Sequence, residues 1–184
     1  VGVEQNTPHH KYDVAQHTLR ALKNVKRDKI LRLTMLFHDM GKPAMRTTDE
    51  NGRDHFKGHA LVSEEIARKV MRRLKFDNDT VKKVSRLVCY HDYRVEATPK
   101  NVRRAMNRIG VELFPYYLAV RMADAKAQST YRRREKIENI VAMRQLYQQA
   151  LLNGECVTLR QLAVGGRELM ELGMQPGREL GSML

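Results

Sequence analysis

Long hydrophobic runs are absent from this 184-residue sequence. No stretch approaches the roughly 18–20 consecutive apolar residues that a membrane-spanning helix needs. The first residues, VGVEQNTPHHKYD, contain no signal-peptide hydrophobic region. Apolar residues nevertheless make up 42% of the chain, which excludes a disordered tail. We expect one domain with a small appendage and no membrane partner.

Cysteine is also scarce. Cys89 and Cys156 lie far apart and match no CxxC spacing. We expect two buried, reduced thiols, which favours a cytoplasmic location. Since the chain does not begin with methionine, we also expect it to be a piece of a longer protein.

Acidic residues are outnumbered, with 21 against 34 basic residues and a net charge of +13. Basic side chains often only solvate helix faces. An imbalance of this size, however, raises the local concentration of anions and favours phosphate-rich partners. We therefore expect a nucleic-acid or nucleotide partner, between which charge alone does not choose.

Helical spacing of apolar residues runs through most of the chain, and internal repeats and low-complexity tracts are absent. Asp13 and the pair Thr98-Pro99 are typical helix starts, and Gly110 is a typical helix end. Helices are predicted after Asp13 and over residues 29–40, 62–74, 81–90, 99–109, 112–127 and 130–152. The predicted fold class is all-α.

Glycine and proline punctuate this pattern. We expect the helix over 29–40 to stop because Gly41 takes a left-handed conformation and Pro43 forbids continuation. Asn51-Gly52 predicts a small hairpin within 44–58. From Gly154 onward, short segments alternate with glycines. We therefore divide the chain into a compact helical domain over 1–153 and a small helical tail over 154–184.

The pair His38-Asp39 ends a strongly apolar helix, where two polar side chains are costly unless something compensates for them. A terminal turn can let both reach one ion. An imidazole with a carboxylate suits Mn, Fe, Co, Ni or Zn better than Ca.

His17 and Asp124 also lie in apolar surroundings. His17 sits between Val14 and Ala21, as either a core histidine or a ligand. Asp124 lies in the apolar stretch LAVRMADAKA, where a carboxylate needs a metal or an ion pair with a neighbour such as Arg121.

The order His17, His38-Asp39 and Asp124, with Gly41-Lys42 after the doublet, resembles the HD superfamily of metal-dependent phosphohydrolases. The resemblance implies a helical bundle in which these four residues bind one ion. A His-Asp doublet alone is weak, since His91-Asp92 is a second one in this chain.

Longer segments resemble the HD region of bacterial tRNA nucleotidyltransferases, the CCA-adding enzymes and their poly(A)-polymerase-like relatives. These segments are HHKYDVAQHTLRAL, LRLTMLFHDMGKP, DENGRDHFKGHALVSEEIA, VRMADAKAQ and the tail LRQLAVGGRELMELGMQPGRELGSML. The GlySer motif and DxD carboxylates of a nucleotidyltransferase head are not among these residues. We therefore expect this chain not to add nucleotides.

The resemblance also implies a second ion. His59 and His91 match its ligands in binuclear HD proteins, and Asp39 would bridge the two ions and orient the attacking water. The expected cofactor is one or two divalent ions of Mn, Fe, Ni, Co or Zn, with Mg also possible. Lys42 either contacts the substrate phosphate or complements a helix dipole.

The implied activity is hydrolysis of a phosphate ester, of the phosphatase or 2′,3′-cyclic phosphodiesterase type, on a nucleotide or RNA end. The alternative is an RNA-binding module, with tRNA as the possible partner and a structural or vestigial metal site. Candidate phosphate contacts, which could equally be solvated helix faces, are Arg103, Arg104, Arg132, Arg133 and Arg134.

Overall fold

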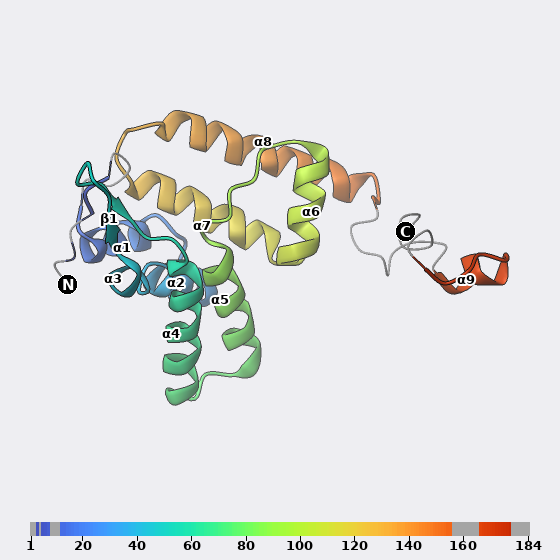
Figure 1. The fold of residues 1–184 in the computed structure, drawn as a ribbon, viewed down its shortest axis with the longest axis horizontal. Helices are drawn as coiled ribbons and strands as arrows, with labels where there is room; N and C mark the ends of the chain where they lie inside the picture. The colour runs from blue at the N-terminus through green and yellow to red at the C-terminus, as the bar shows by residue number, and fades with distance from the viewer. Residues whose placement is uncertain (1–2, 4, 8–11, 156–165, 178–184) are drawn as a thin grey trace.

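The computed structural model confirms an all-α fold (Figure 1). It describes every residue except 1–2, 4, 8–11, 156–165 and 178–184. The helices are α1 (Val14–Lys23), α2 (Lys29–Phe37), α3 (Lys42–Met45), α4 (His59–Arg73), α5 (Asn78–Tyr90), α6 (Pro99–Ile109), α7 (Phe114–Ala127), α8 (Arg133–Leu152) and α9 (Gly166–Glu171). Short strands β1 (Thr47–Thr48) and β2 (Asp54–His55) pair antiparallel, which confirms the predicted hairpin.

Side-chain caps fix where several helices begin. The predicted cap Asp13 accepts a hydrogen bond from the backbone N–H of Gln16, at 2.7 Å. Thr98 caps α6 in the same way, and Pro99 opens that helix as predicted. Asp28 and Asp77 begin α2 and α5 by the same mechanism.

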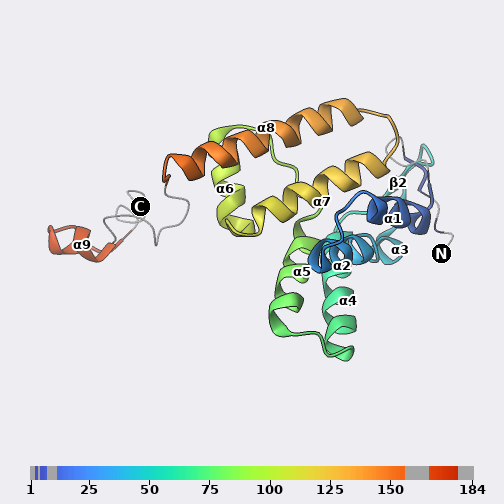
Figure 2. The same cartoon turned by 180° about the vertical axis from the view of Figure 1, so that it is seen from behind.

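Three apolar clusters hold the helices together. One, around Phe114 and Tyr117, joins α5, α6, α7 and α8. A second, around Met35, joins α1, α2 and α7. The third, around Met71, joins α2, α4 and α5. Since α2, α5 and α7 each belong to two clusters, polar side chains on these helices are brought into a largely dry interior. Figure 2 shows α1 and α2 beside α7 on one side of the bundle and α4 paired with α5.

The predicted left-handed conformation of Gly41 is wrong. Its φ and ψ are −80° and −13°, and Pro43 lies in the first turn of α3 instead of ending a helix. Close packing explains the glycine: a Cβ atom here would lie 2.3 Å from the carbonyl oxygen of His59 and 2.7 Å from the backbone nitrogen of Ser63. Only glycine lets this turn rest against the first turn of α4.

Other boundaries also shift. The predicted helix over 29–40 ends at Phe37, with His38 as its C-cap. Cys89 is half-buried instead of buried, because it lines a surface pocket, and Cys156 lies outside the described residues. The division at 153/154 remains a prediction beside a helix that ends at Leu152. None of the described helices combines the length and apolarity required to cross a membrane.

Replacing Gly41 should therefore be costly. We expect Gly41→Ala to lower the free energy of unfolding by about 1–3 kcal/mol, because the backbone of α4 must move to admit the methyl group. Gly177→Ala is the matched control, since a Cβ atom there meets no atom within 4 Å. Urea denaturation measures both, and equal stability of the two variants would contradict this packing.

Candidate metal centre

The structure brings all six sequence-predicted ligands together. His17 lies in α1 and Asp124 in α7, His59 is the first residue of α4, and His91 is the C-cap of α5. The doublet His38-Asp39 occupies the turn after α2. These residues are buried, with exposed fractions from 0% to 8%.

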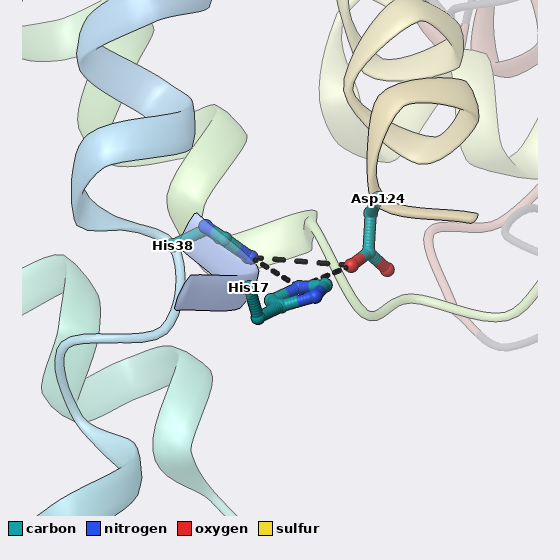
Figure 3. A group of neighbouring side chains, drawn as sticks. All are labelled: His17, His38 and Asp124. Atoms are coloured by element: carbon teal, nitrogen blue, oxygen red, sulfur yellow. Dashed lines mark hydrogen bonds and ion pairs between the residues drawn. The ribbon is translucent and has the colours of Figure 1, made fainter. Parts of the chain in front are cut away.

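The first group comprises His17, His38 and Asp124, shown in Figure 3 pointing toward one another from separate elements. His17 Nε2 lies 2.9 Å from Asp124 Oδ1 and 3.3 Å from His38 Nε2. His38 Nε2 lies 3.9 Å from the same carboxylate oxygen. Three ligand atoms therefore converge on one point.

The second group comprises Asp39, His59 and His91. The Nε2 atoms of His59 and His91 are 3.0 Å apart, and they lie 3.4 and 3.6 Å from Asp39 Oδ1. The other oxygen of Asp39, Oδ2, lies 3.3 Å from His38 Nε2 and 3.6 Å from His17 Nε2. The Asp39 carboxylate thus stands between the two groups.

Backbone carbonyls fix the histidine tautomers. His38, His59 and His91 place Nδ1 at 2.7, 2.8 and 2.7 Å from a carbonyl oxygen three residues earlier. A carbonyl only accepts, so each Nδ1 donates its proton to that carbonyl, and Nε2 is the ring nitrogen that faces the other ligands. Two such Nε2 atoms face each other across 3.0 Å in His59 and His91. A divalent cation would satisfy this arrangement, and imidazole with carboxylate suits a transition metal.

The carboxylates are held in their charged form. Burial raises the pKa of Asp39, but the positive charges of His38 and Lys42 outweigh it and hold that pKa well below its usual range. Lys42 Nζ lies 2.7 Å from Asp39 Oδ2 and donates to Gln5 Oε1 at 2.7 Å. Lys42 is 4% exposed, so it is neither a solvated helix cation nor a surface side chain.

Asp124 is compensated differently from the expected ion pair with Arg121. Burial raises the pKa of Asp124, while the hydrogen bond and charge of His17 lower it by more, so that the pKa lies far below its usual value. Its other oxygen accepts from Gln128 Nε2 at 2.8 Å. Arg121 instead contacts the carboxylate of Asp92, at 3.8 Å, and the carbonyl of His91.

A cleft of about 1010 Å³ opens onto Asp39, His59, His91 and Asp124. The basic side chains that line it are Lys42, Arg53, Lys57, Arg94, Arg121, Arg132 and Lys136. Besides the ligands Asp39 and Asp124, the carboxylates of Asp54, Asp92, Glu96 and Glu135 line it too, so the basic groups are in excess. Arg94 and Arg121 pair with Asp92, and Arg132 pairs with Glu135. Most of the basic side chains were missed at the level of sequence, because they come from separate loops and helices and form no run. The cleft can therefore receive an anionic group beside the ligands.

The five arginines predicted to contact phosphate separate in space. Arg132 lines the cleft, whereas Arg103 and Arg104 do not. Arg103 pairs with Glu155, and Arg134 pairs with Glu138 at 2.7 Å. Arg133 donates to the carbonyl of Gln128.

Comparison with known proteins identifies the family of the chain. The HD domain family matches residues 9–147. An A-adding tRNA nucleotidyltransferase of Deinococcus radiodurans is 30% identical over the whole of this chain, and a CC-adding tRNA nucleotidyltransferase of Thermus thermophilus is 33% identical. The chain spans 43% and 42% of the lengths of these two relatives. Both findings confirm the resemblance seen in the sequence, and the chain belongs to the HD domain family.

Proposed function

We propose that this chain is a metal-dependent phosphohydrolase acting on a phosphate ester of a nucleotide or an RNA end. The observation that carries the proposal is the pair of three-ligand groups, with the Asp39 carboxylate between them, beside a cleft whose lining has seven basic and six acidic side chains. Buried imidazoles and carboxylates at this density are typical of metal centres rather than of an apolar core.

The ligands divide between one or two ions. His17, His38 and Asp124 would hold one, and His59 with His91 would hold the other, with Asp39 between them. A bound divalent ion polarises a phosphoryl oxygen and makes coordinated water more acidic. Mn, Fe, Ni, Co and Zn suit this donor set better than Mg, whose preferred ligands are oxygens.

The remaining charged groups of the site would orient the attacking water and neutralise the charge of the substrate. Asp39 is the acceptor placed to orient an attacking water. Lys42 keeps Asp39 charged by contact at 2.7 Å, and it lines the cleft where the charge of a phosphoryl group would develop. The basic side chains of the cleft lining would hold the rest of an anionic substrate. Arg94 follows His91 closely in the sequence, and Arg121 donates to the carbonyl of His91.

The substrate assignment draws on the relatives. Both are named as tRNA nucleotidyltransferases, and the chain covers less than half of each. A terminal phosphate or a 2′,3′-cyclic phosphate of RNA, or the corresponding nucleotide, fits both features of the site. It is an ester that a metal centre can hydrolyse, and it is an anion that the basic side chains of the cleft can bind. We infer that the division at 153/154 separates this hydrolytic domain from a small tail.

Asp39→Asn tests the shared ligand. We expect it to lower bound metal and to reduce turnover of bis-p-nitrophenyl phosphate or a 2′,3′-cyclic nucleotide at least a hundredfold, because a neutral amide replaces the bridging carboxylate. Metal content by mass spectrometry and hydrolysis under Mn, Ni, Co and Mg measure the two effects. Asp79→Asn, on the exposed surface of α5, is the control. Turnover that survives in Asp39→Asn would refute the proposed centre.

Metal removal should destabilise the fold, since the native state alone assembles the ligands. At a free metal concentration about 100 times Kd, binding contributes about 2.7 kcal/mol. For a chain of this size, this corresponds to a Tm higher by roughly 5–10 °C. Thermal unfolding with metal and with chelator measures the difference. A Tm that is the same with and without metal contradicts a site bound in the native state.

The second candidate function is an RNA-binding module, favoured by the seven basic side chains in the cleft lining and by the net charge of +13. Arg94→Glu/Arg132→Glu, which reverses two charges of the cleft lining, should weaken tRNA binding and reduce its salt dependence, while Asp39→Asn should leave binding intact. Arg133 is left unchanged because it holds the carbonyl of Gln128. The control, Lys26→Glu/Arg27→Glu, makes the same charge change on an exposed loop outside the cleft. Equal losses in the two double variants would speak against a defined docking surface.

A further inference from the structure

A second pocket, of about 430 Å³, lies between α4 and α5. The two helices run side by side as a hairpin joined by residues 74–77 (Figure 1). Among the residues that the structure describes, none lines both this groove and the metal cleft. The groove is therefore a separate feature, formed by the lengths of α4 and α5 that follow His59 and precede His91.

The groove has an excess of positive charge. Arg68 and Arg72 line it from α4, and Lys82 and Arg86 line it from α5. The carboxylate in the lining is Glu64, which pairs with Arg68. In the described part of the chain, Arg72 and Lys82 are exposed and form no ion pair. Two cations on opposite walls of the groove are thus available to an anion.

A residue with a buried hydroxyl belongs to the lining of the same groove. Ser85 is 2% exposed and lines the pocket, yet its Oγ has no hydrogen-bond partner among the described residues. A serine within a helix can bond back to the carbonyl four residues earlier, and the Oγ of Ser85 makes no such bond. A buried hydroxyl without a partner costs free energy, and a hydrogen bond to a ligand would recover that cost.

The cations repeat along each wall. Arg68 and Arg72 are four residues apart on α4, as are Lys82 and Arg86 on α5. Four residues of helix advance about 6 Å along the axis. Arg68 already pairs with Glu64, and Arg86 donates to the carbonyls of Ile109 and Arg108, so a ligand meets Arg72 and Lys82 first. Cations spaced along both walls suit a chain that carries a charge at every unit better than a single ion. The forked guanidinium of arginine matches the oxygens of a phosphate.

We propose that the groove between α4 and α5 binds the phosphodiester backbone of a nucleic-acid strand. Arg72 and Lys82 neutralise its phosphates, and the Ser85 hydroxyl donates to a phosphate oxygen. This binding does not depend on hydrolysis at the metal centre, so either assignment can fail alone.

Anisotropy of a labelled single-stranded RNA oligomer, titrated at several salt concentrations, tests the groove. Arg72→Gln/Lys82→Gln should weaken binding about tenfold and reduce the salt slope by about 1.4, because two phosphate contacts are lost. The matched control is Arg73→Gln/Lys75→Gln, which removes two exposed cations outside the groove. Its affinity should stay within about twofold of the unaltered chain.

Ser85→Ala separates ligand binding from folding. The hydroxyl has no partner in the described structure, so its loss should leave the unfolding free energy unchanged or higher while RNA binding weakens several-fold. Equal losses in the groove and control variants would overturn the proposal. So would polyglutamate binding as tightly as RNA through the same residues, or unaltered RNA affinity in Ser85→Ala. Inorganic phosphate should compete only weakly, and strong competition would indicate a single-anion site instead.

Discussion

The buried charge of Asp39 is the constraint around which the surrounding helices are arranged. Its carboxylate is 2% exposed, and one oxygen faces His59 and His91 while the other faces His38 and Lys42. A charge taken out of water costs several kcal/mol unless partners replace the lost hydration. Helices α1 and α4 and the C-cap of α5 each supply an imidazole at this point, and the first residue of α3 supplies the ammonium. Loss of a single partner is therefore costly, because it leaves the buried charge partly uncompensated.

Close backbone packing makes this convergence possible. Gly41 lets the turn after the doublet touch the first turn of α4, and its N–H donates to Ser63 Oγ at 2.8 Å. The contact fixes the start of α4, and with it His59, relative to Asp39. Carbonyls at the ends of α2 and α5 then orient His38 and His91. The same local geometry that ends these helices therefore prepares their last side chains to act as ligands.

Local patterns in the sequence predicted much of this structure. Periodicity gave the helices, and the capping residues Asp13 and Thr98 gave two of their starts, because both depend on neighbouring residues. The six candidate ligands followed from their order and from the family resemblance. The role of Gly41 did not follow, because a tight contact with another helix and a left-handed turn both select glycine.

Long-range partners were the other limit of sequence reasoning. Asp124 meets His17, 107 residues away, and Gln128, whereas the sequence offered its near neighbour Arg121. Gln5 reaches Lys42 across 37 residues. The basic side chains of the cleft likewise come one at a time from distant segments, so no run of basic residues in the sequence predicts them. Such contacts depend on how helices pack, which periodicity does not encode.

Anomalous diffraction from crystals soaked in Mn²⁺ tests the central claim most directly, because it locates an ion without reference to activity. The account predicts a peak within coordination distance of His17 and His38 Nε2, with a second peak near His59 and His91 if two ions bind. Both peaks should vanish in Asp39→Asn crystals or fall strongly in occupancy. Absence of any peak at these histidines in fully soaked crystals, or peaks only at surface carboxylates, would contradict it.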